Sequence, residues 1–109
     1  MIKLTNQQKE DIDAIAWHFG DERVLLRAAE ELSEASVAAL QYLRSSKGDG
    51  FVAARRQEFI EELADVCVMM EQLLILHPEW KELIERTADS KIARTLDRYD
   101  IKEPEDAQG

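Results

Sequence analysis

The sequence predicts an all-α protein, and three observations lead to that prediction. Apolar residues recur at helical spacing along almost the whole 109-residue chain, and no segment shows the alternation typical of a strand. Only four glycines and two prolines interrupt this pattern. Hydrophobic residues make up 45% and charged residues 34% of the chain, which is typical of a folded globular domain and not of a disordered one.

The first two predicted helices meet at Gly20. Thr5 followed by Gln8 resembles a capping box, which marks the start of a helix, and apolar residues continue at helical spacing to Phe19. Gly20 ends this helix, and Asp21 suits the N-cap of a second helix that runs to about residue 44. The apolar face of the second helix is expected to comprise Leu25, Ala28, Ala29, Leu32, Ser36, Ala39 and Leu43.

Two further helices are expected after the loop 45–50, whose sequence is SSKGDG. The third spans about 52–76, because Pro78 disfavours a helical residue before it and suits the first turn of a new helix. The fourth then runs over about 79–98. Residues 1–102 would form one domain, and 103–109 have too few apolar side chains to pack, so we expect a mobile tail there.

The third helix is apolar on nearly every side, which predicts that it is buried on nearly every side. Its main apolar arc comprises Phe59, Val66, Met69, Met70 and Leu73, and its opposite side carries Ile60, Cys67, Val68 and Ile75. Four helices of one small chain cannot easily surround it. We therefore expect a second copy to complete the bundle, as a homodimer or a dimer of dimers. A thin core padded by the tail or by loops is the alternative.

Four carboxylates stand out at two short spacings. Glu31 and Glu34 are three residues apart in the second helix, and Glu62 and Asp65 are three apart in the third, so each pair lies on one side of its helix. At about 100° per residue, Glu62 falls inside the apolar arc and Asp65 on its edge. A buried carboxylate is unfavourable unless a partner offsets its charge. Any one acid among 23 needs no special explanation, but two aligned pairs predict a metal site.

The two pairs should lie at a common level. If the helices around the loop 45–50 are antiparallel neighbours, both pairs are about equally far from that loop. Four acids with oxygen ligands suit Mg²⁺, with Mn²⁺ also possible. A zinc site would need His or Cys ligands at short spacing, and a di-iron bundle would need Glu-x-x-His, which neither His18 nor His77 supplies.

Charge narrows the classes of partner. A formal charge of −9 argues against nucleic acid and anionic membranes. One cysteine and the lack of a long apolar run suggest the cytoplasm.

The commonest function of Mg²⁺ bound to carboxylates is to bind phosphate oxygens and activate water. Arg27 lies one turn before the first acid pair, and Lys91, Arg94 and Arg98 form a basic stripe on the fourth helix; both groups suit phosphate contacts, although solvated charges are the alternative.

These residues resemble a known family. The segments 30–34 (EELSE) and 62–65 (ELAD) look like the EExxE…ExxD signature of MazG-type nucleotide pyrophosphohydrolases, in the all-α NTP pyrophosphatase superfamily. The segments 19–22 (FGDE) and 91–94 (KIAR) look like its flanking segments, so the resemblance covers about 15–98. It implies a four-helix MazG-like unit that dimerises tightly. It also implies cleavage of a nucleoside triphosphate between the α and β phosphates, to a monophosphate and pyrophosphate.

The resemblance also implies roles for single residues. By similarity, Glu31, Glu34, Glu62 and Asp65 would hold Mg²⁺, Lys91 and Arg94 would contact phosphates, and Arg27 matches a further basic position. Glu34 and Glu62 are the candidate catalytic residues, with Glu34 a candidate general base for in-line attack of water on the α-phosphorus. Glu58 stands where related enzymes may have a basic residue, which leaves the substrate open.

Several functions remain open. The expected role is house-cleaning of the nucleotide pool, but relatives with dedicated substrates cleave dUTP, dCTP or phosphoribosyl-ATP. A non-catalytic acidic helical module that binds a partner helix is the alternative in another class, and it would not need Glu62 inside an apolar arc. Trp17, His18 and Phe19 could stack a base, although core or dimer-interface roles suit Trp17 and Phe19 better.

Overall fold

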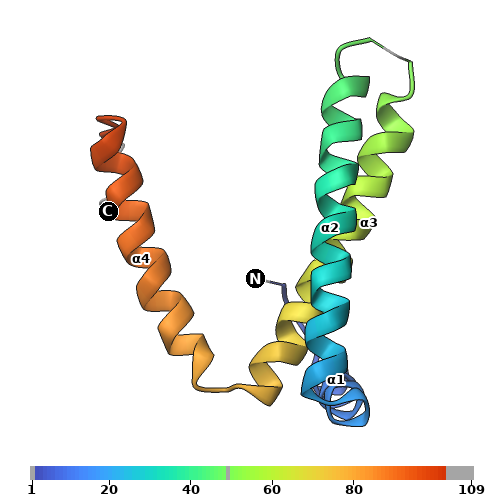
Figure 1. Cartoon of the computed structure of the whole chain (residues 1–109), viewed down its shortest axis with the longest axis vertical. Coiled ribbons are helices and arrows are strands. Elements are labelled where there is room, and N and C mark those ends of the chain that lie inside the picture. The colour runs from blue at the N-terminus through green and yellow to red at the C-terminus, as the bar shows by residue number, and fades with distance from the viewer. Residues whose placement is uncertain (1, 49, 103–109) are drawn as a thin grey trace. The chain divides into compact units, whose positions relative to one another are not determined.

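The computed structural model describes residues 2–48 and 50–102, and over these residues the chain is helical without any strand. Its helices are α1 (Asn6–Phe19), α2 (Asp21–Ser45), α3 (Val52–Leu76) and α4 (Trp80–Arg98), as Figure 1 shows. The all-α prediction is confirmed, and the helix boundaries lie close to the expected ones. The tail predicted at 103–109 lies outside the described residues. None of the described helices has the length and apolar character needed to cross a membrane.

The chain divides into two compact units. The first ends at Pro78 and contains α1, α2 and α3, and the second begins at Glu79 and contains α4. The single four-helix unit expected from the sequence therefore stays a prediction.

Local signals fix the ends of α1. The Thr5 hydroxyl accepts a hydrogen bond from the Gln8 backbone N–H at 3.1 Å, and the Gln8 side chain accepts one from the Thr5 N–H at 2.9 Å. This is the predicted capping box. At the other end Gly20 has φ +80°, a conformation that a side chain would disfavour. Glycine there lets the chain turn directly from α1 into α2. Gly20 is also the N-cap of α2, so the expectation that Asp21 would cap this helix was wrong: Asp21 is the first helical residue, and no side chain caps the helix.

Helices α2 and α3 run antiparallel and side by side, and α1 packs against both of them (Figure 1). The side of α2 that contacts α3 carries small side chains: Val24, Ala28, Ala35 and Ala38 are all buried. Met69 of α3 is buried against Val24 and Ala28, with Leu73 and Leu76 packed around this cluster. Small residues allow the two helix axes to approach closely.

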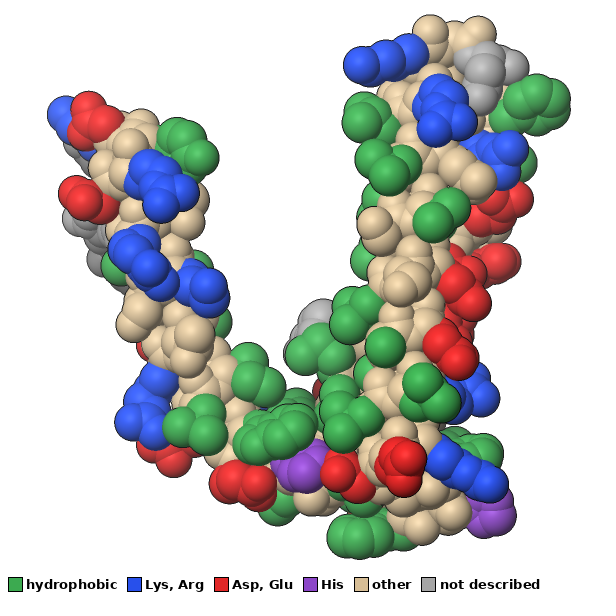
Figure 2. Space-filling model, viewed as in Figure 1, with side chains coloured by type: hydrophobic (Ala, Val, Ile, Leu, Met, Phe, Trp, Pro, Cys, Tyr) green, Lys and Arg blue, Asp and Glu red, His purple; other side chains and the backbone are tan. Residues whose placement is uncertain are grey.

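The predicted apolar face of α2 was mostly wrong. Leu25, Leu32 and Leu43 are exposed, and of the expected set only Ala28 is buried. The physical reason is that α2 has two apolar sides, and the side with small residues is the one that packs on α3. The larger residues form what we call the leucine arc, visible as hydrophobic side chains along α2 in Figure 2. The arc consists of Leu25, Leu26, Leu32, Val37, Leu40 and Leu43.

Helix α3 is partly enclosed without a second copy of the chain. Cys67, Val68 and Ile75, which were assigned to its far side, are half-buried, and Val68 lines a cavity together with Ile15 and Phe19 of α1. Ile60 and Leu63 remain exposed. The first unit thus covers part of the surface for which a partner was expected, and the homodimer stays a prediction.

Candidate metal centre

Three of the four predicted carboxylates converge where α2 and α3 pack together. Glu31 of α2 and Glu62 and Asp65 of α3 each place a carboxylate oxygen within 4.8 Å of the others. In the described part of the chain, this is the one group of three or more His, Cys, Asp or Glu residues arranged in this way. Antiparallel packing brings the two pairs to the common level that the sequence predicted. Their role as metal ligands stays a prediction.

Two oxygen atoms of this acid cluster are buried without a hydrogen-bond partner in the part of the chain that the structure describes. Glu31 Oε2 and Glu62 Oε2 have no hydrogen-bond partner among the described residues. The Glu31 side chain is only 13% exposed, and Glu62 is half-buried. Buried polar atoms are nearly always paired, and an ionised oxygen is especially unfavourable without a partner. These atoms therefore favour uptake of a proton or a cation.

The pKa shifts of the cluster also favour uptake of a proton or a cation. Burial raises the pKa of the Glu31 carboxyl, and the charges of Asp65 and Glu34 raise it further, against the lowering effects of the Arg27 charge and of a side-chain interaction with Glu62. Burial also raises the pKa of Glu62, and the charges of Glu34, Glu31 and Asp65, together with a side-chain interaction with Glu34, add to that effect. Glu34 lies outside the group of three converging oxygens, but its charge acts on both glutamates. A divalent cation would relieve this mutual repulsion.

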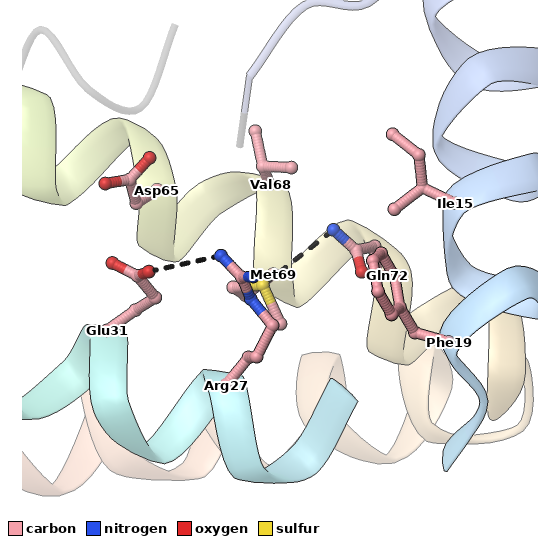
Figure 3. Close-up of a pocket in the computed structure, with 8 residues that line it drawn as sticks. All are labelled: Ile15, Phe19, Arg27, Glu31, Asp65, Val68, Met69 and Gln72. Carbon is pink, nitrogen blue, oxygen red and sulfur yellow. Dashed lines mark hydrogen bonds and ion pairs between the residues drawn. The ribbon is translucent and has the colours of Figure 1, made fainter. Parts of the chain in front are cut away.

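Arg27 lies at the rim of the cluster. Its guanidinium Nη2 is 3.7 Å from Glu31 Oε1, one helical turn away, and its side chain is half exposed (Figure 3). This ion pair compensates one oxygen of Glu31 and leaves Oε2 unpaired. At 3.7 Å this contact is longer than a hydrogen bond, and the Arg27 end of the pair is half exposed to solvent. Arg27 is thus available to turn toward an anion bound beside the carboxylates.

A cavity of about 200 Å³ adjoins the acid cluster between α1, α2 and α3. In Figure 3, Glu31 and Asp65 lie at one end of this cavity, and Gln72 and Phe19 lie at the other. The full lining comprises Ile15, Phe19, Arg27, Glu31, Asp65, Val68, Met69 and Gln72. The site therefore joins a charged end to a largely apolar slot.

Sequence reasoning missed Gln72. Its residue surface is only 5% exposed, and it lies on α3 one turn after Met69. The signal was present, because a carboxamide interrupts an apolar run that includes Met69 and Leu73. Phe19 does line the cavity, whereas Trp17 is well exposed and is not among the lining residues.

The predicted basic stripe lies on α4, in the second unit. Lys91, Arg94 and Arg98 line a hollow of about 260 Å³ together with Thr95. Figure 2 shows the basic side chains gathered along this helix. The stripe thus exists as a local feature of α4, and its contact with phosphates stays a prediction.

Comparisons with protein-family models, with curated proteins and with solved structures found no match for this chain.

Proposed function

We propose that the chain is a Mg²⁺-dependent nucleoside triphosphate pyrophosphohydrolase, with Mn²⁺ as a possible substitute. The observation that carries the proposal is the convergence of Glu31, Glu62 and Asp65 beside a cavity, where two buried oxygen atoms have no hydrogen-bond partner among the described residues. The resemblance of segments 30–34 and 62–65 to the MazG-type signature supports the same reaction. The products would be a nucleoside monophosphate and pyrophosphate.

The donor set fits a hard divalent cation. Glu31, Glu62 and Asp65 offer only carboxylate oxygens, which Mg²⁺ and Mn²⁺ prefer, and Glu34 stands close enough to add its charge. When bound there, Mg²⁺ would neutralise phosphate oxygens and activate water. A triphosphate could not approach these acids otherwise, because its charge has the same sign.

The chain's own residues would then position the reactants. Glu34, which is outside the converging group, is the candidate to accept the proton of the attacking water. Arg27 would turn from Glu31 toward a phosphate oxygen. Lys91 and Arg94 would hold the departing pyrophosphate through charge-assisted hydrogen bonds. In-line attack at the α-phosphorus would follow from this positioning, and the protein would contribute mainly orientation and electrostatics.

Assembly is part of the proposal. The leucine arc of α2, together with Ile60 and Leu63 of α3, leaves a large apolar surface exposed in the first unit. Apolar patches of this kind mark interaction surfaces. A second copy of the chain would cover them, giving a homodimer or a dimer of dimers.

We also propose a biological role for this reaction, the removal of unwanted nucleotides (house-cleaning) from a cytoplasmic nucleotide pool.

A substrate panel tests the proposed reaction. The protein would be incubated with the common NTPs and dNTPs and Mg²⁺, and release of pyrophosphate would be compared with release of single phosphates. Hydrolysis in ¹⁸O-labelled water should place the label in the monophosphate, since water attacks the α-phosphorus. Release of no pyrophosphate from any member would favour the non-catalytic interaction module instead.

A further inference from the structure

The end of the α2–α3 hairpin is basic, although the whole chain has a formal charge of −9. In the sequence, residues 40–57 contain four basic residues and a single acid, Asp49, which lies outside the described residues. Figure 2 shows basic and hydrophobic side chains gathered at this end of the hairpin, with acidic side chains farther along it. We define the basic tip as five exposed residues: Arg44, Lys47, Phe51, Val52 and Arg56.

A tight turn holds the basic tip at the end of two long helices (Figure 1). The Lys47 N–H donates to the Arg44 carbonyl at 3.2 Å, which begins the turn. Gly48 and Gly50 have φ of +112° and +86°, so the chain can reverse before α3 begins. The end of a helical hairpin is convex and small, whereas a stable protein interface covers about 800 Å² on each partner. A fluid surface suits it better, because it needs no matching shape.

Phe51 occupies a position where a small polar residue would stabilise α3 better. It is the N-cap of α3, and its side chain makes no capping hydrogen bond. Ser, Thr, Asp and Asn are preferred at an N-cap because their side-chain oxygen accepts a hydrogen bond from the first turn. Phe51 is instead 63% exposed, and Val52 beside it is exposed as well. The tip thus presents an apolar anchor to solvent, outside the leucine arc.

The acidic part of the first unit is far enough from the tip to be screened. Glu58, the first acid of α3, is paired with Arg55 at 3.2 Å. The next acids are Glu61 in α3 and Glu34 in α2, which lie at least nine residues from the loop end of their helices, or about 14 Å at roughly 1.5 Å per residue. This exceeds the Debye length of about 10 Å at 0.1 M salt. Net charge therefore does not decide what binds at the tip.

We propose that the basic tip docks on a lipid surface that is rich in anionic headgroups. Arg44, Lys47 and Arg56 would pair with headgroup phosphates, and Phe51 and Val52 would enter the boundary between headgroups and acyl chains. A small apolar anchor combined with a basic cluster supplies the two attractions that reversible membrane binding needs. This inference goes beyond the proposed function and does not depend on it, because the tip contains no residue of the acid cluster.

Vesicle sedimentation tests the docking. The full chain would be mixed with vesicles of phosphatidylcholine alone or of an equal mixture with phosphatidylglycerol, in about 0.1 M salt. A chelator would be present, so that Mg²⁺ cannot bridge carboxylates to the lipid. We expect sedimentation only with the anionic vesicles, and its loss at about 1 M salt, where the Debye length is about 3 Å. No sedimentation with anionic vesicles, or equal sedimentation with both kinds, would overturn the inference.

Charge reversal identifies the surface that binds. Each basic residue near an anionic surface strengthens binding about 5-fold, so the double variant Lys47→Glu/Arg56→Glu should bind anionic vesicles at least about 25-fold more weakly. The matched control is Lys3→Glu/Lys9→Glu, which makes the same charge change at two exposed positions near the N-terminus and should bind like the wild type. Equal loss in both double variants would mean that only net charge matters and would overturn the inference. Pyrophosphate release in solution should be unchanged in both.

Phe51→Ser separates a membrane anchor from a structural role. It should lower binding to anionic vesicles about 5- to 20-fold. Its melting temperature should equal or exceed that of the wild type, because Ser is a preferred N-cap. Trp17→Ser, at a position that is also 63% exposed, is the control and should bind normally. Unchanged binding of Phe51→Ser, or binding of short single-stranded DNA in place of vesicles, would overturn a lipid surface as the partner.

Discussion

At the scale of single residues, Glu31 and Glu62 link the candidate site to stability. Their pKa values are raised in the folded protein, chiefly by burial and then by neighbouring acids. The folded state therefore holds these protons more tightly than the unfolded chain. The stability that they contribute is fully present below their ordinary pKa of 4.5 and is lost as the pH rises through the raised values.

This linkage predicts that the melting temperature of the metal-free protein depends on pH and that Mg²⁺ raises it at neutral pH. In the presence of a chelator, the melting temperature of the wild type should fall more steeply than that of Glu62→Gln as the pH rises above the ordinary pKa of 4.5. Millimolar Mg²⁺ at pH 7 should raise the wild-type melting temperature by mass action and leave Glu62→Gln unchanged. Thermal scans across pH would check this, with Glu61→Gln as a control because Glu61 is exposed and outside the cluster. Parallel curves for all three proteins would refute the linkage.

At the scale of helices, the small residues of α2 set how closely it approaches α3. Ala35 is buried on the packing side, one turn after Glu31, so the same close packing brings the carboxylates together. Ala35→Leu should overpack this contact and lower the free energy of unfolding by about 1–3 kcal/mol. It should also weaken Mg²⁺ binding, because it separates Glu31 from Glu62 and Asp65.

Chemical denaturation and calorimetric Mg²⁺ titration would measure these two effects. Ala14→Leu makes the same substitution at an exposed position of α1 and should change neither. If Ala35→Leu proved as stable as the wild type, the α2–α3 packing described above would be wrong.

Helix α4 carries a separate prediction about phosphate contacts. If Lys91 and Arg94 hold the leaving pyrophosphate, Lys91→Ala and Arg94→Ala should each lower kcat/KM by about 10- to 150-fold. Arg98→Ala should be milder, since Arg98 is the last residue of the helix. Mg²⁺ affinity of the free protein should change little, because none of these residues is a proposed ligand. Steady-state kinetics would measure these values. A kcat/KM close to that of the wild type for all three variants would mean that the basic stripe is only a solvated surface.

The helices also show what the sequence can and cannot predict. Their ends follow local signals, such as the capping box at Thr5, the break at Gly20 and the position of Pro78, so they were predicted well. The side of α2 that packs on α3 was predicted wrongly, because α2 has two apolar sides and only the position of α3 decides which of them is buried. The convergence of the acidic residues was predicted because both pairs are about equally far in sequence from the loop between α2 and α3. The cavity at Gln72 depends on where α1 packs, which no local pattern determines.

At the scale of the whole molecule, the leucine arc predicts association. Leu40 is 58% exposed in the single chain, where Leu40→Lys should be nearly neutral. In a dimer that buries the arc, the added charge should lower both association and stability. Light scattering with thermal unfolding would measure both, and Gln57→Lys, at an exposed polar position of α3, serves as the control. A wild-type monomer at micromolar concentration would contradict the proposed assembly.

The central claim is that the acid cluster between α2 and α3 supports Mg²⁺-dependent cleavage of nucleoside triphosphates. Its most direct test is the rate of pyrophosphate release by the wild type, Glu62→Gln and Glu61→Gln in the same Mg²⁺ buffer. Glu62 is half-buried in the cluster, and Glu61, its neighbour in sequence, is exposed outside it. We expect the wild type and Glu61→Gln to release pyrophosphate at similar rates and Glu62→Gln to release none. Full activity of Glu62→Gln, or equal loss in both variants, would contradict the account.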